Sequence, residues 1–283
     1  MFLEKKCKKK CKKKKNKQLK HRQFLDYEHS KVSYLRFGNG PNLLIAFHGF
    51  ADRAAIFLPL RNALENKYTI FSIDLPYNGQ TEWKKNYFSR QDIGELIQII
   101  LKKEKKDRFA LMGYSFGGRI AQAILFDFYP FIEKIYLIAP DGIATHGLFN
   151  VTIMPRPMKK VVLWVMRWLL QKPRWAVRTI DILFRLRLLS KFKHDFIYSH
   201  ISTKVRRERI FCTWLSLSDF TFSPELVKNL LRETQIPTEL FFGKKDELVP
   251  LRAGEWLANG LLNVRLHKLE GGHLLIDEQM MTP

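Results

Sequence analysis

Three polar side chains in this 283-residue sequence have the types that nucleophilic catalysis needs: Ser115, Asp246 and His273. A serine hydroxyl becomes a useful nucleophile when a histidine takes its proton and a carboxylate orients that histidine. Each of the three follows a short apolar run, which predicts that all three lie at the carboxyl ends of parallel strands. Open α/β sheets place their sites at that edge.

Ser115 is the best defined of the three. It is the third residue of Gly-Tyr-Ser-Phe-Gly-Gly at residues 113–118, between the apolar run Phe109–Met112 and a helix that the spacing predicts over Arg119–Phe128. A serine with glycine two positions to either side, on a strand–turn–helix, is the pattern of a nucleophile elbow. The helix N-terminus favours the negative charge that develops there. The alternative is an ordinary glycine turn.

The sequence offers two histidines as the base. His273 lies in a loop after the predicted strand Val264–Leu269, and His48 ends the predicted strand Asn42–Phe47. The position of His273 favours it, although a loop histidine can also be purely structural.

Two aspartates could orient that histidine. Asp246 follows the predicted strand Glu239–Phe242 in a Gly-x-x-Asp-x-x-Val-Pro segment, and Asp141 follows the earlier predicted strand Lys134–Ala139. Both loops fit the same sheet edge, so position alone leaves the two open.

The elements that must position these side chains alternate between strands and helices. Helical spacing over Asp92–Lys102 separates the predicted strand Tyr68–Ile73 from the strand that precedes Ser115. Units of this kind predict the α/β class, a mostly parallel, doubly wound sheet covered on both faces. Residues 143–235 interrupt the pattern with a helical composition, and we expect an inserted helical cap there. The predicted organisation is a disordered polybasic tail at residues 1–22, a core at residues 23–142 and 236–283, and the cap at residues 143–235.

On these motifs the sequence resembles the α/β-hydrolase superfamily, specifically the cap-bearing branch of carboxylesterases, lipases and carbon–carbon bond hydrolases. The resemblance covers roughly residues 31–140 and 236–277. It implies an α/β-hydrolase fold, with Ser115 as nucleophile, His273 as general base and Asp246 as the orienting acid. It favours Asp246 because the Gly-x-x-Asp-x-x-Val-Pro arrangement recurs in that family.

The same resemblance implies an oxyanion hole. The segment His48-Gly49-Phe50 is similar to the family's oxyanion motif, so the backbone N–H of Phe50 would act together with that of Phe116, and His48 and Gly49 would hold the loop.

Two features depart from the family pattern. The turn at residues 74–81 resembles the family's Asp-x-Pro-Gly-x-Gly-x-Ser/Thr segment, but Tyr77 and Asn78 differ from it. Ten residues follow His273, which leaves the long helix usual after that loop short or missing.

The formal net charge of +22 is concentrated in two segments. Residues 1–22 hold twelve Lys/Arg and one acidic residue, and residues 146–211 hold fifteen Lys/Arg and three acidic residues. The rest of the chain is nearly neutral and carries every candidate catalytic residue, which makes nucleic acid an unfavoured partner. The basic residues of the cap are either simply solvated, or the cap meets an anionic membrane surface or admits an acyl chain with an acidic head group. At a membrane surface, the basic tail and cap would act together.

Composition also bears on the compartment and on cofactors. Three cysteines in a chain of this length fit a reducing compartment, and neither a secretory signal nor a transmembrane span is predicted. We expect a cytoplasmic protein, associated with a membrane surface, and no metal or cofactor, because no ligand cluster or phosphate-binding loop has the required spacing.

The favoured function is hydrolysis of a small-molecule carboxylic ester with an apolar acyl group, through an acyl-enzyme. The first alternative is a hydrolase that cleaves a carbon–carbon bond in a dienoic ketone acid, whose charge suits the basic cap. The second is a non-catalytic protein that binds an anionic membrane or RNA on a hydrolase scaffold. An inert regulatory hydrolase is a further possibility.

Overall fold

The computed structural model describes residues 22–143 and 156–281. An eight-stranded sheet is its centre, with the strand order β1-β2-β4-β3-β5-β6-β7-β8. All neighbouring strands from β4 to β8 are parallel, and only the pairings of β1 with β2 and of β2 with β4 are antiparallel. The strands are β1 (Arg22–Tyr27), β2 (Ser30–Phe37), β3 (Asn42–Phe47), β4 (Tyr68–Ile73), β5 (Phe109–Tyr114), β6 (Ile132–Ile138), β7 (Thr238–Gly243) and β8 (Val264–Leu269).

The predicted α/β class and mostly parallel sheet are confirmed. Strands β3, β4 and β8 have the predicted bounds. β3 and β4 are apolar runs buried between helices, whereas β8 is the edge strand and is mostly half-buried or exposed. The hairpin of β1 and β2 was not predicted. It adds two antiparallel strands at the edge of the sheet. β1 is largely exposed and gives a weak apolar signal, whereas β2 is mostly buried but contains Ser, Lys and Arg among its apolar residues. The predicted tail lies outside the described residues apart from Arg22, which begins β1 and pairs with Asp74.

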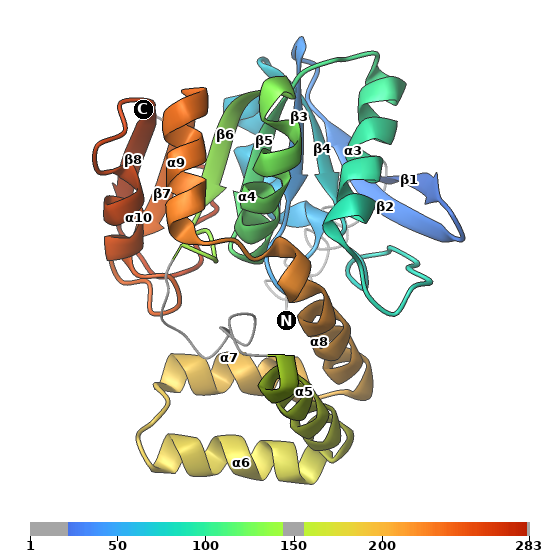
Figure 1. Ribbon diagram of the computed structural model, residues 1–283, viewed down its shortest axis with the longest axis vertical. Helices are drawn as coiled ribbons and strands as arrows, with labels where there is room; N and C mark the ends of the chain where they lie inside the picture. The colour runs from blue at the N-terminus through green and yellow to red at the C-terminus, as the bar shows by residue number, and fades with distance from the viewer. Residues whose placement is uncertain (1–21, 144–155, 282–283) are drawn as a thin grey trace, which may run out of the picture.

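Helices cover both faces of the sheet (Figure 1). One face packs against α3 (Arg90–Glu104), α4 (Phe116–Phe128), α9 (Pro224–Thr234) and α10 (Leu251–Ala258) around a large apolar cluster. The other face packs against the 3-10 helix η1 (Ala54–Leu60), the short α2 (Arg61–Leu64) and the C-terminal segment. The helices predicted over residues 92–102 and 119–128 are therefore present, as parts of α3 and α4.

A group of helices follows β6 and lies beyond the carboxyl ends of the parallel strands (Figure 1). It consists of α5 (Arg156–Gln171), α6 (Pro173–Arg185), α7 (Lys191–Ile201) and α8 (Lys204–Ser216). These helices share a small apolar cluster of their own. The predicted insertion also included α9, but α9 packs on the sheet, with Val227 and Leu231 in the large cluster. We call α5–α8 the cap below.

Candidate active site

Ser115 lies at the sharp turn between β5 and α4. Its backbone has a φ of 50° and a ψ of −116°, a conformation that is strained for any residue with a side chain. Its N–H donates to the carbonyl of Ile138 over 2.9 Å. The turn packs so tightly on β3 that a Cβ on Gly117 would lie 1.9 Å from the carbonyl oxygen of Phe47. Glycine at that position therefore lets the hydroxyl of Ser115 stand above the strand ends.

The structure brings Ser115, His273 and Asp246 into one hydrogen-bonded chain. The Nε2 atom of His273 lies 2.9 Å from the Oγ of Ser115, and its Nδ1 lies 2.8 Å from Oδ2 of Asp246. Asp246 and His273 are buried. In this arrangement His273 can take the proton of the serine hydroxyl while Asp246 fixes the orientation of the ring.

Backbone groups hold Asp246 in place. Its Oδ1 accepts hydrogen bonds from the N–H groups of Leu248 and Val249, at 2.8 and 2.9 Å, which leaves Oδ2 for the imidazole. The hydroxyl of Tyr114 donates to the carbonyl of His273 over 3.1 Å. Asp246 is thus positioned by the backbone of its own loop, and His273 by a side chain of β5.

Asp141, the other candidate acid, has a different partner. It forms a two-pronged ion pair with Arg119, whose Nε and Nη2 lie 2.8 and 3.0 Å from its carboxylate oxygens. The guanidinium of Arg119 is buried, so this pair compensates its charge. The structure places Asp246, and not Asp141, against His273.

His48 lies next to the site as a buried neutral ring. Its Nε2 accepts the N–H of Leu75 over 3.0 Å, so the proton lies on Nδ1, which donates to the carbonyl of Gly49 over 2.7 Å. Burial lowers the pKa of His48, in agreement with this neutral form. Both nitrogens are occupied in shaping the loop, which separates His48 from the role of base.

The loop that His48 shapes runs directly beside the serine. A Cβ on Gly49 would lie 3.4 Å from the Cβ of Ser115, and the rings of Phe50 and Phe116 meet edge to face at 6.5 Å. Phe116 is the first residue of α4, so its N–H has no acceptor within the helix. The predicted oxyanion residues are therefore adjacent to the serine.

The turn after β4 departs from the family motif at Tyr77, which has a φ of 64°. Glycine favours that conformation, and here tyrosine adopts it, with its hydroxyl donating to the carbonyl of Lys85 over 2.7 Å. Asp74 holds the turn, since its carboxylate accepts the N–H groups of Ala54 and Gln80. The departure leaves the fold of the turn intact.

A cavity of about 90 Å³ opens beside the serine. It is lined mainly by apolar side chains, and two of them, Trp214 and Leu217, come from α8 and from the 3-10 helix η4 (Leu217–Phe220) that follows it. The remaining lining residues are Phe50, Ser115, Phe116, Asp141, Leu248 and Val249. The cap and the core thus build this pocket together.

Comparison with known proteins decides the family. A family model described as the alpha/beta hydrolase fold matches residues 42–207, more than half of the chain. The chain belongs to the α/β-hydrolase family. This confirms the resemblance seen in the sequence, and the protein is a hydrolase of that fold.

Individual relatives of the hydrolase are distant. It is 24% identical over 260 residues to an uncharacterized hydrolase, YugF, of Bacillus subtilis, covering 88% of this chain and 89% of that protein. It is 23% identical over 275 residues to the monoacylglycerol lipase abhd6-B of Xenopus laevis, covering 93% of this chain and 78% of that protein. Among solved structures, a hydrolase from Pseudomonas aeruginosa superposes with a TM-score of 0.62 at 16% identity, covering 89% of this chain and 91% of that one.

One charged residue of the hydrolase near this site was not found from the sequence. Arg209 of α8 is half-buried, and its Nε is enclosed without a hydrogen-bond partner among the described residues. Burial lowers the pKa of Arg209, and its positive charge contributes to the lowered pKa of His48. No motif marks Arg209 or Trp214. The placement of α8 brings Trp214 to the wall of the cavity and brings Arg209 close enough to His48 to influence its pKa.

Two further observations concern the hydrolase as a whole. Within residues 22–143 and 156–281, no cluster of three or more His, Cys, Asp or Glu side chains could hold a metal ion. None of the helices in these two ranges combines the length and the apolar character needed to span a bilayer.

Proposed function

We propose that this protein is a serine hydrolase of small-molecule carboxylic esters, with Ser115, His273 and Asp246 as its catalytic residues. The observation that carries the proposal is the chain of hydrogen bonds from the Ser115 hydroxyl through His273 to Asp246, at 2.9 and 2.8 Å. It lies at the carboxyl edge of the sheet, beside an apolar pocket. No cofactor takes part in this reaction.

The proposed reaction begins when the Oγ of Ser115 attacks the ester carbonyl while Nε2 of His273 takes its proton. Asp246 stabilises the imidazolium that forms. The backbone N–H groups of Phe50 and Phe116 bind the oxyanion of the tetrahedral intermediate, each contributing about 3–4 kcal/mol. His273 then protonates the leaving alcohol, and a water molecule activated by His273 releases the acyl group.

The walls of the pocket support an apolar acyl group. Phe50, Phe116, Trp214 and Leu217 surround the space beside the serine, and burying each CH₂ of an acyl chain there contributes about 0.8 kcal/mol. The monoacylglycerol lipase relative is named for a substrate of the same class, an acyl ester. As part of the proposal, we place the enzyme in the cytoplasm, at an anionic membrane surface.

Covalent labelling tests the nucleophile. A fluorophosphonate probe should label the wild-type protein, and S115A should abolish the labelling. S202A, which changes an exposed serine of the cap, is the matched control and should be labelled like the wild type. Labelling that survives S115A would assign the nucleophile elsewhere.

Arg209 favours a second candidate, in which the substrate carries an acidic group. A half-buried guanidinium without a counter-charge among the described residues would be compensated by a carboxylate on the substrate. Cleavage of a carbon–carbon bond in a dienoic ketone acid by the same three residues would use such a contact.

Substrate charge separates the two candidates. If the substrate is acidic, R209M should raise KM about 10- to 100-fold for a carboxylate-bearing substrate, with little change for a neutral p-nitrophenyl ester. R206M is the control, because the exposed Arg206 binds the carbonyl of Ser199 at the end of α7. Equal effects of R209M on both substrates would exclude the acidic contact.

A further inference from the structure

The cap exposes large apolar side chains on two of its helices. Trp164 of α5 is 68% exposed, and Trp175 of α6 is 55% exposed. We define the outer face of the cap by eight exposed apolar residues of these helices and of the segment after α6: Val161, Trp164, Val165, Trp168, Trp175, Ile182, Leu186 and Leu188. Phe184 of α6 is also exposed but lies against the ring of His194, so it is not included.

On α6, the outer face is distinct from the side that packs within the cap. Ala176 and Ile180 are buried in the apolar cluster of the cap. Trp175 and Ile182 lie seven residues apart, on the opposite side of the helix, where both are exposed. The helix therefore has an apolar surface beyond the one it needs for folding.

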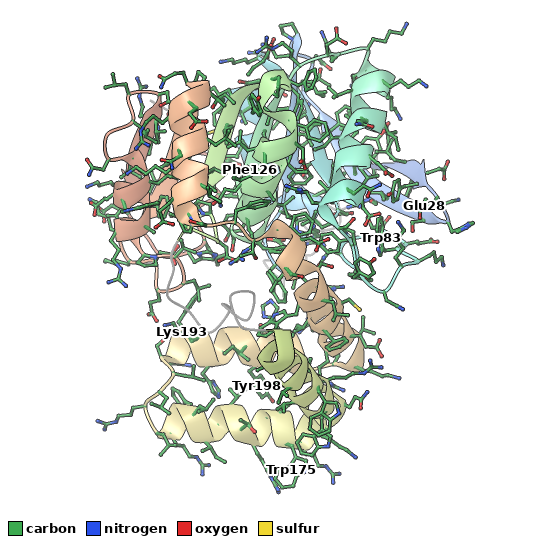
Figure 2. The ribbon with its side chains drawn as sticks, viewed as in Figure 1. Glu28, Trp83, Phe126, Trp175, Lys193 and Tyr198 are labelled. Atoms are coloured by element: carbon green, nitrogen blue, oxygen red, sulfur yellow. The ribbon has the colours of Figure 1, made fainter. Side chains whose placement is uncertain are left out.

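The exposed stripes of α5 and α6 meet. Val161, Trp164, Val165 and Trp168 recur at the three- and four-residue spacing of one helix face, and the ring of Trp168 lies 6.5 Å from that of Trp175. Figure 2 shows Trp175 at the end of the molecule that is farthest from the sheet. The contact between Trp168 and Trp175 thus connects the exposed stripe of α5 to that of α6.

Positive charge surrounds this apolar surface. Residues 156–190 contain nine Lys/Arg and one acidic residue, Asp181. Asp181 lies 3.0 Å from Nε2 of His194, whereas Arg178 lies over the ring of Trp175 at 6.0 Å. Arg174, Arg178 and Arg185 are all exposed.

We propose that the outer face of the cap docks on the surface of an anionic lipid bilayer. Indole rings prefer the boundary between headgroups and acyl chains, and arginine side chains there reach anionic headgroups. A surface that bound a partner only through charge would have no use for three exposed tryptophans. A surface that bound only through apolar contacts would have no use for the excess of arginine. This inference rests on the membrane location given in the proposed function and assigns the surface that makes the contact, and it does not depend on the ester hydrolysis.

Vesicle flotation of the full-length chain tests the docking. The wild type should float with vesicles that contain about 30% phosphatidylglycerol and remain unbound with pure phosphatidylcholine. W164S/W175S should bind about tenfold more weakly, because it removes two indoles from the interface. F131S is the control, since Phe131 is 47% exposed in the short 3-10 helix η2 (Tyr129–Phe131) between α4 and β6, outside the cap. It should bind like the wild type.

High salt distinguishes vesicle binding by the outer face of the cap from vesicle binding by the basic N-terminal segment. At about 0.5 M NaCl, binding by charge alone fades, so the wild type should retain part of its binding and W164S/W175S should lose it. Brominated lipids should quench the tryptophan emission of the wild type more than that of the variant. Running flotation on S115A as well keeps docking separate from catalysis.

The docking proposal would be overturned if the wild type and W164S/W175S bound anionic vesicles equally, or if brominated lipids did not quench the tryptophan emission. It would also be overturned if the wild type bound neutral vesicles as well as anionic ones, or if it formed an oligomer that W164S/W175S converted to monomers. This last result would assign the outer face to a second copy of this chain. RNA binding that W164S/W175S abolishes while vesicle binding persists would assign it to nucleic acid.

Discussion

The two oxygens of Asp246 have separate tasks, and this makes D246N informative. Oδ1 accepts two backbone N–H groups, and Oδ2 faces Nδ1 of His273. An asparagine amide at the second position donates a hydrogen bond, which places the imidazole in the wrong tautomer. We expect kcat/KM for p-nitrophenyl butyrate to fall about 10⁴-fold with the fold retained.

D141N is the companion variant for this prediction. It weakens the only ion pair described for the buried guanidinium of Arg119, so it should lower the free energy of unfolding by about 3 kcal/mol while costing far less activity than D246N. Chemical denaturation and steady-state kinetics measure the two effects. A larger loss of activity in D141N would transfer the orienting role to Asp141.

The buried neutral His48 predicts how stability changes with pH. Its pKa in the folded protein is lowered by burial from the ordinary value of 6.5, so below pH 6.5 the unfolded chain binds a proton that the folded chain does not. This contribution destabilises the fold as the pH falls below 6.5, because the unfolded chain gains a proton there and the folded chain does not.

H48Q tests the contribution of this ring. Denaturant unfolding at pH 7.5 and 5.5 should show a smaller loss of stability for H48Q than for the wild type. His194, whose pKa is raised by Asp181 and Asp195, titrates in both proteins and cancels in the comparison. An identical pH dependence in both proteins would contradict the assignment of His48 as neutral.

At the residue scale, local motifs predicted the positions that now form the hydrogen-bonded chain. Ser115 and its glycines form a single turn, so the six residues 113–118 are enough to predict the position of the nucleophile. Arg209 and Trp214 could not be predicted, because their role depends on how α8 crosses the sheet edge. No local pattern records that crossing.

At the scale of elements, too, features set by the local sequence could be predicted, and features set by tertiary packing could not. The strands β3 and β4 were predicted with their exact bounds because buried parallel strands are continuous apolar runs. The edge strand β8, which mixes apolar and basic residues, was also predicted with its exact bounds. The hairpin β1–β2 was missed because its first strand is mostly exposed. For the cap, helical composition was visible, but the assignment of α9 to the sheet depends on tertiary packing at Val227 and Leu231.

Helix α8 contributes Trp214 to the wall of the pocket, which gives a prediction about acyl length. Because the cavity measures only about 90 Å³, the wild type should prefer short acyl esters. W214L replaces the indole with a smaller side chain and so enlarges the cavity. We expect the ratio of kcat/KM for octanoate to that for acetate p-nitrophenyl esters to rise by at least about tenfold, from roughly two further buried CH₂ groups.

W256L controls for loss of an indole, because Trp256 lies on α10 and does not line the cavity. It should keep the wild-type ratio. A ratio unchanged in W214L would mean that the acyl chain leaves the pocket by another route.

At the scale of the whole molecule, the core and the cap are each stabilised by their own apolar clusters, and those of the core are much larger. The sheet is covered on both faces by two extensive clusters. The cap has its own cluster of five buried residues: Ala176, Ile180, Leu189, Ile201 and Ile210. Phe50 and Trp214 pack against it, so the residues that line the pocket also connect the two parts.

This difference predicts a hierarchy of local opening. Amides of α6 and α7 should exchange with solvent through openings of the cap alone, with protection at least about 100-fold lower than in β3 and β5. Hydrogen-exchange mass spectrometry of the full chain measures both. Helix α8 should be intermediate, because Ile210 belongs to the cap while Trp214 also packs on the core. Equal protection throughout would show that cap and core open as one unit, and the pocket roof would then be as rigid as the sheet beneath it.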